Sequence, residues 1–185
     1  MPRLVYLTML ALVGCATSQQ RTLPSAGGRT HAMVPTATTG PAQTEDIVLH
    51  DEPGIVAEAI SAPLDSAWAQ LRATYSDLNM PTNAMDAASH TIGTGPTVAH
   101  GSFAGAHLSA LIDCGYSMNG NKADLYTVRL NVRTQVVPNA GGGTIVKTLI
   151  EATAHDEGSS TDPVACSTTG RLGQRIAKTL AARLK

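Results

Sequence analysis

Two short clusters in the sequence combine a histidine with two acids, His50-Asp51-Glu52 and His155-Asp156-Glu157. Imidazole and carboxylate groups are the common general acids and bases of enzymes, and they are also frequent metal ligands. Both clusters fall at expected strand ends or in loops, where acids also serve turn formation. Spacing along the chain does not bring the two clusters together. We therefore expect no metal site and no cofactor.

Other residue patterns in the chain resemble catalytic motifs, but their spacing does not match those motifs. His100 and His107 flank Gly101-Ser102-Phe103-Ala104-Gly105, but the serine directly follows the glycine, so this is not the Gly-x-Ser-x-Gly elbow of a hydrolase. The run Gly141-Gly142-Gly143 lacks the lysine and the following helix of a phosphate-binding loop, and we expect it at a hairpin tip. The chain contains neither Ser-x-x-Lys nor His-Glu-x-x-His. We identify no catalytic residue.

Basic residues gather at the C-terminus. Five of the 13 lysines and arginines fall in the last 15 positions, with no acid among them: Arg171, Arg175, Lys178, Arg183 and Lys185. Cations near the C-terminal end of a helix interact favourably with its dipole, so a solvated helix face accounts for them structurally. The functional alternative is contact with an acidic partner or with anionic lipid headgroups. We keep these five residues as possible partner-binding residues.

The three cysteines differ in their surroundings. Cys15 ends an N-terminal segment in which Arg3 precedes an apolar run over residues 4–13, which is the pattern of a secretory signal. The ending Leu12-Val13-Gly14-Cys15 resembles the lipobox of bacterial lipoproteins. The resemblance implies cleavage after Gly14 and a lipid-modified Cys15 that anchors the protein in a membrane. The absence of Asp after that cysteine resembles outer-membrane sorting, with the protein facing the periplasm.

The other two cysteines, Cys114 and Cys166, are expected to form a disulfide, because export brings them into an oxidising compartment. A bridge across about 52 residues stabilises the fold by about 4 kcal/mol on the chain-entropy model. The alternative is a reactive thiol beside a histidine.

Residues 1–14 are thus predicted to be a signal peptide, residues 15–45 the lipid-modified cysteine with a tether, and residues 46–185 a globular domain. Residues 16–45 are rich in Thr, Ala, Pro, Gly, Ser and Gln and show no hydrophobic period, which is typical of a disordered segment. A flexible linker of this length spans about 30 Å on average.

Within the domain, hydrophobic periodicity predicts one helix near each end of a set of antiparallel strands. The first helix has apolar residues at helical spacing and Ser61 or Asp65 as its N-cap; the apolar residues are Leu64, Trp68, Leu71, Tyr75 and Leu78. The second helix lies at the C-terminus and repeats leucine or isoleucine every four residues. Its N-cap is expected to be Ser167, Thr168 or Thr169. Alternation predicts strands over 124–137 and 144–154, joined as a hairpin, and a further strand over 106–114. Short strands are expected near 46–50, 55–60, 90–94 and 97–100, and a turn at 119–121. The fold class is α+β, with helices on one sheet face.

The segment from Ile60 to Leu71 resembles the start of the helix-grip family of START and Bet v 1-like proteins, in which an Ala-Pro turn leads from a strand into a helix with an early Trp. The architecture is also similar to the helix-grip domains of a small lipoprotein subunit of the outer-membrane β-barrel assembly machine. These resemblances imply an antiparallel sheet that packs one face against a long C-terminal helix.

These observations favour an envelope lipoprotein that works as a non-enzymatic binding or scaffolding module, with a membrane contact through its lipid and an envelope protein as partner. The alternatives are a carrier that holds a small apolar ligand between sheet and helix, and an envelope hydrolase. The formal net charge of −1 argues against a nucleic-acid partner.

Overall fold

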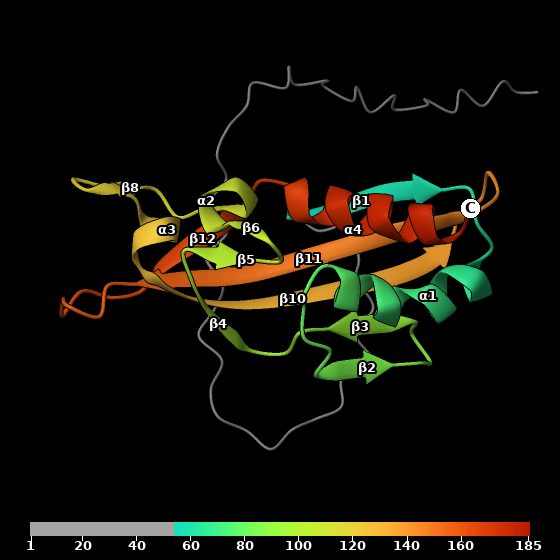
Figure 1. The fold of residues 1–185 in the computed structure, drawn as a ribbon, viewed down its shortest axis with the longest axis horizontal. Coiled ribbons are helices and arrows are strands. Elements are labelled where there is room, and N and C mark those ends of the chain that lie inside the picture. Colours follow the sequence, from blue (N-terminus) through green and yellow to red (C-terminus); the bar gives the residue numbers. More distant parts are fainter. Residues whose placement is uncertain (1–53) are drawn as a thin grey trace, which may run out of the picture. The chain divides into compact units, whose positions relative to one another are not determined.

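The computed structural model describes residues 54–185, which form a mixed α and β domain (Figure 1). Its first half contains strand β1 (Ile55–Ile60), helix α1 (Leu64–Asp77) and strands β2 (Ala84–Asp86), β3 (Thr91–Gly93) and β4 (Thr97–His100). Short elements follow: β5 (Ser102–Phe103), β6 (Ala106–His107), α2 (Leu108–Leu111), β7 (Ile112–Asp113), β8 (Tyr116–Ser117), β9 (Gly120–Asn121) and α3 (Lys122–Leu125). The domain ends with β10 (Thr127–Pro138), β11 (Thr144–His155), β12 (Val164–Thr168) and α4 (Arg171–Arg183).

The long hairpin of β10 and β11 is the centre of an eight-stranded sheet. Its register runs from Thr127 opposite His155 to Pro138 opposite Thr144. Strands β3 and β4 pair with the other side of β10, while β1 and β12 pair with the far side of β11. Every pairing is antiparallel, which confirms the expected class of sheet.

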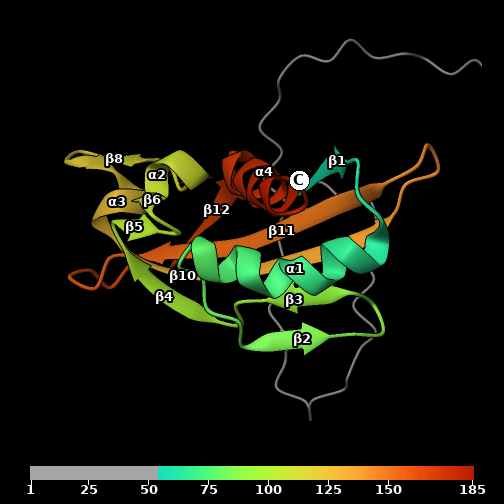
Figure 2. The ribbon, with the colours of Figure 1, turned by 45° about the vertical axis from the view of Figure 1, so that its right-hand side comes forward.

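Helices α1 and α4 both lie on the same face of this sheet (Figures 1 and 2). Alternate residues of the central strands point to that face and are buried; they include Val128, Val132, Val136, Val146 and Ile150. The intervening positions of β10 and β11 carry most of their charged side chains and form the open face of the sheet. One packed and one wet face is the arrangement that strict alternation predicts for an antiparallel sheet.

Each helix buries one stripe of side chains against the sheet. Helix α1 buries Leu71 and Tyr75, and α4 buries Leu172, Ile176 and Leu180. A glycine lets α4 come close to β1, since a Cβ atom on Gly173 would lie 2.9 Å from Cβ of Val56. The position of α4 therefore depends on the absence of a side chain at residue 173.

A short chain of hydroxyl groups crosses the core between α1 and the sheet. The Tyr75 hydroxyl donates to Oγ1 of Thr134 at 2.8 Å, and Thr134 lies 3.3 Å from Oγ1 of Thr148. Burial raises the pKa of the Tyr75 phenol. Because buried polar groups are costly without partners, these bonds hold the tyrosine in one position in the core.

Several local predictions were wrong. The strand expected over 106–114 is interrupted by helix α2, because Leu108 and Leu111 lie one turn apart and are both buried. The strand expected from Asp124 begins at Thr127, because the side chain of Asn121 accepts a hydrogen bond from the Ala123 N–H and caps helix α3. Strand β12 was not anticipated.

The helix caps also differ from expectation. Neither Ser61 nor Asp65 caps α1, which starts after Pro63 without a side-chain cap. Gly170 is the N-cap of α4 and has a positive φ of 82°, while the Thr168 hydroxyl accepts a hydrogen bond from its N–H at 3.1 Å. A left-handed conformation at this position favours glycine over Ser or Thr.

Candidate functional site

The solvent-facing side of α4 carries most of the C-terminal positive charge. Arg171, Lys178 and Lys185 are exposed, and Arg175 is half buried. We call these four residues the basic face. No acid occurs in α4, so no intrahelical ion pair reduces this charge. The arrangement is suited to an acidic surface, and it is also what a solvated helix requires.

Arg183, the fifth predicted residue, is held in an ion pair with Asp77 at the end of α1. Its Nε donates to Oδ2 at 2.5 Å and its terminal nitrogen to Oδ1 at 2.6 Å, so the contact is bidentate. The hydrogen bond from Arg183 lowers the pKa of the Asp77 carboxyl. Arg183 thus links the two helices, a role that the sequence pattern did not separate from the other basic residues.

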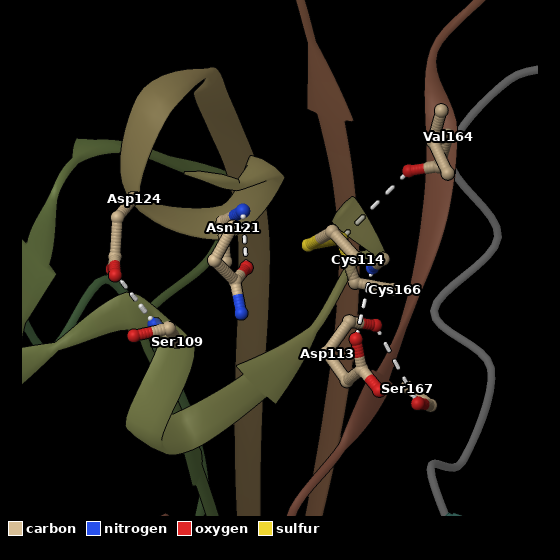
Figure 3. Close-up of a disulfide and its surroundings, with 10 residues drawn as sticks. Ser109, Asp113, Cys114, Asn121, Asp124, Val164, Cys166 and Ser167 are labelled. Atoms are coloured by element: carbon tan, nitrogen blue, oxygen red, sulfur yellow. Dashed lines mark hydrogen bonds between the residues drawn. A yellow bond between two sulfur atoms is a disulfide. The ribbon is translucent and has the colours of Figure 1, made fainter. Parts of the chain in front are cut away.

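The predicted disulfide between Cys114 and Cys166 is confirmed (Figure 3). It joins the segment after β7 to strand β12, and the two Cα atoms are 4.2 Å apart. Close by, the Thr169 hydroxyl donates to the Ala110 carbonyl at 2.7 Å. The bridge therefore fixes the short elements between β4 and β10 to the strand that leads into α4.

A hollow of about 280 Å³ lies on the open face of the sheet, across β4, β10 and β11. Its lining includes Val98, Arg129, Asn131, Glu151 and Thr153. Val98 is 56% exposed, and Asn131 donates to Glu151 at 3.2 Å. The hollow is open and mixes an apolar floor with one charge of each sign, which suits surface contact with a polar partner better than enclosure of an apolar molecule.

Two of the singled-out histidines lie at one end of the open face. The Thr127 hydroxyl donates to Oε1 of Glu157 at 2.8 Å, and its oxygen lies 3.4 Å from Nδ1 of His100. His155 is opposite Thr127 in the register, and its Nδ1 is buried without a hydrogen-bond partner. Asp156 accepts a bond from the Gly158 N–H at 3.1 Å, as a turn residue does. Among residues 54–185, no group of three or more His, Cys, Asp or Glu side chains is arranged to hold a metal ion.

The remaining candidate motifs either belong to a hairpin or loop of the domain or lie outside the described residues. His107 pairs with Ser102 across the β5–β6 hairpin. Residues 141–143 form the loop between β10 and β11, as expected. The cluster His50-Asp51-Glu52 lies outside the described residues.

The lipid-anchor predictions also fall on residues that the structure does not describe: the signal peptide 1–14, Cys15, the tether to residue 45 and the strand expected over 46–50. Over residues 54–185, no helix is both long and apolar enough to cross a membrane.

Comparison with known proteins adds no family. No protein-family model matches the chain, and a search of curated proteins finds no significant match.

The sequence analysis missed three exposed apolar side chains in and directly after the β8–β9 hairpin. Tyr116, Met118 and Leu125 are 76%, 104% and 52% exposed, respectively. The expected turn at Asn119-Gly120-Asn121 could have predicted this exposure, because side chains beside a hairpin turn usually point into solvent.

Proposed function

We propose that this protein is a lipid-anchored lipoprotein of the bacterial envelope, held at the outer membrane on its periplasmic side, that acts as a non-enzymatic binding module. The basic face of α4 is its contact surface for an envelope partner with an acidic surface. The observation that carries this proposal is that Arg171 and Lys178 are exposed on a helix without acids, with Lys185 exposed just after its end.

The rigidity of α4 supports a binding role. The helix is paired to α1 through Arg183 and Asp77, packs closely on β1 at Gly173, and starts next to the strand that carries Cys166. Groups that are already fixed lose little conformational entropy when a partner binds. The basic face can therefore bind without a rearrangement of the domain.

The segment Leu12-Val13-Gly14-Cys15 supports the anchor. A tethered domain meets membrane-associated partners at a high effective concentration, so even a modest electrostatic contact suffices for recruitment. The placement of α1 and α4 on one sheet face is compatible with a helix-grip domain, which stays part of this proposal.

A carrier role has less support. The layer between helices and sheet is filled by large side chains that are fully buried, such as Leu71, Tyr75 and Ile176. The hollow of about 280 Å³ lies on the opposite, open face. A ligand held between sheet and helix would have to displace core residues, which is costly in a close-packed interior.

The binding surface is tested with a photo-crosslinking residue at Lys178, in intact cells. The matched control is the same probe at Arg72, an exposed basic residue on α1. We expect a discrete adduct from position 178, none from position 72, and loss of the adduct when Arg171 and Arg175 are changed to Glu. Equal adducts at both positions, or an adduct that is insensitive to charge reversal, would contradict the proposed surface.

The anchor is tested separately. Cys15→Ala should move the protein from the membrane fraction to the soluble fraction and abolish palmitate labelling. A variant that stays on the membrane, together with an unlabelled wild-type protein, would exclude lipid attachment at this residue.

A further inference from the structure

We propose that the β8–β9 hairpin is a second membrane contact, in which an apolar tip formed by Tyr116, Met118 and Leu125 inserts into the headgroup region of a lipid bilayer. The inference rests on the proposed function in one respect: the anchor at Cys15 brings the tip within reach of a membrane.

Tyr116 lies in β8, Met118 follows at the hairpin turn, and Leu125 ends α3, which comes directly after β9. In both ribbon views the β8–β9 hairpin stands out from the rest of the domain, close to α3 (Figures 1 and 2). A Cβ atom on Gly120 would lie 3.6 Å from Cδ1 of Leu125, so Leu125 lies against the hairpin. Met118, at 104%, is the most exposed large apolar side chain among residues 54–185.

Hydrogen bonds hold the backbone of the hairpin in place, and they keep the apolar side chains at its tip exposed. The Lys122 N–H donates to the Gly115 carbonyl at 3.0 Å, and the Ser117 hydroxyl donates to the Gly120 carbonyl at 3.1 Å. Cys114, at the base of the hairpin, is fixed by the disulfide. An apolar group that cannot fold back onto the domain stays available for a partner.

The size and shape of the tip favour a bilayer over a protein partner. A stable protein interface buries about 800 Å² on each partner, with a hydrophobic centre and a polar rim. Two side chains on a projecting hairpin and one on the helical turn that follows it are too few for such an area. A bilayer requires only apolar surface, and it accepts an aromatic hydroxyl at the interface, where Tyr is favoured.

The charges near the tip agree with lipid headgroups. Lys122 follows β9 directly, and its ammonium on a flexible stem can reach a phosphate. The two nearby acids point toward backbone groups: Asp113 accepts from the Gly115 N–H and Asp124 from the Ser109 N–H, both at 2.9 Å (Figure 3 shows Asp124 and Ser109). Neither acid is directed at the tip.

The first test places an environment-sensitive fluorophore on Met118→Cys in the full-length lipidated protein, reconstituted in vesicles of phosphatidylethanolamine and phosphatidylglycerol. The matched control carries the fluorophore on Met85→Cys, because Met85 is also an exposed methionine, at 51%, and lies on β2. We expect a blue-shifted emission and quenching by acyl-chain spin labels at position 118, and neither at position 85. Equal emission at the two positions would overturn the proposal.

The second test does not need the lipid. In the Cys15→Ala chain, Met118→Asp should weaken partition into the same vesicles by at least about tenfold, while Met85→Asp leaves it unchanged. Both variants share the same N-terminal segment, so the difference reports on the tip alone. If Met118→Asp leaves the partition into vesicles unchanged, the proposed insertion of the tip is wrong, even if Cys15 proves to be lipid-modified. A signal that appears in native membranes but not in pure lipid would assign the tip to a protein partner instead.

Discussion

Gly173→Ala tests whether the close approach of α4 to β1 fixes the helix that carries the basic face. The added methyl would lie 2.9 Å from both Cβ and Cγ1 of Val56 and 3.4 Å from Cβ of Thr148. Such overpacking costs about 1–3 kcal/mol, because the backbones must move apart. Alanine regains about 1 kcal/mol of helix propensity, so we expect a net loss of up to about 2 kcal/mol.

The assay is urea denaturation followed by circular dichroism, with Val56→Ala as the rescuing partner. In the Val56→Ala background Cγ1 is gone while Cβ remains, so Gly173→Ala should cost less stability there than it does in the wild type. Gly141→Ala is the matched control, because a Cβ atom there meets nothing closer than 3.9 Å. If Gly173→Ala alone raises the unfolding midpoint, helix propensity decides the outcome and the packing argument is refuted.

Three further perturbations address the bonds that hold the domain together. Replacing Cys114 and Cys166 by Ser should lower the free energy of unfolding by about 4 kcal/mol, because the bridge closes a loop of 52 residues; equal urea midpoints for variant and wild type would contradict this. Tyr75→Phe removes a buried hydroxyl bond and should cost about 1 kcal/mol near neutral pH. Burial raises the pKa of Tyr75, so the wild type loses stability as the pH rises above the ordinary tyrosine pKa of about 10, and the variant should lack this loss in an alkaline denaturation series. The hydrogen bond from Arg183 lowers the pKa of Asp77, so its contribution is present above the ordinary Asp pKa of about 4 and is lost as the pH falls. Calorimetry should therefore show a lower Tm for Asp77→Asn than for wild type near neutral pH, and a difference that shrinks as the pH falls below about 4.

The antiparallel hairpin was predictable because its signal is local. Val128, Leu130 and Val132 alternate with Arg129 and Asn131, and the observed strand buries the first set. The C-terminal helix was predictable for the same reason, from leucine and isoleucine at helical spacing.

The short elements between β4 and β10 were not predictable, because their conformation depends on distant contacts. Helix α2 packs Leu108 and Leu111 into the core, and β7 pairs with β12, more than 50 residues later. An alternating pattern over so few residues does not distinguish a strand from one helical turn.

The candidate site was predictable only in part. The sequence places Arg171, Lys178 and Arg183 on one helix, but it does not show that Arg183 binds Asp77, 106 residues away. The apolar tip was missed because exposure of Met118 is a property of the folded hairpin.

The most direct test of the anchored binding module is the intact mass of the protein purified from bacterial membranes, with identification of its N-terminal peptide. The account predicts a chain that begins at Cys15 and carries the added mass of its acyl chains. A chain that begins at Met1 with an unmodified thiol at Cys15 would contradict it.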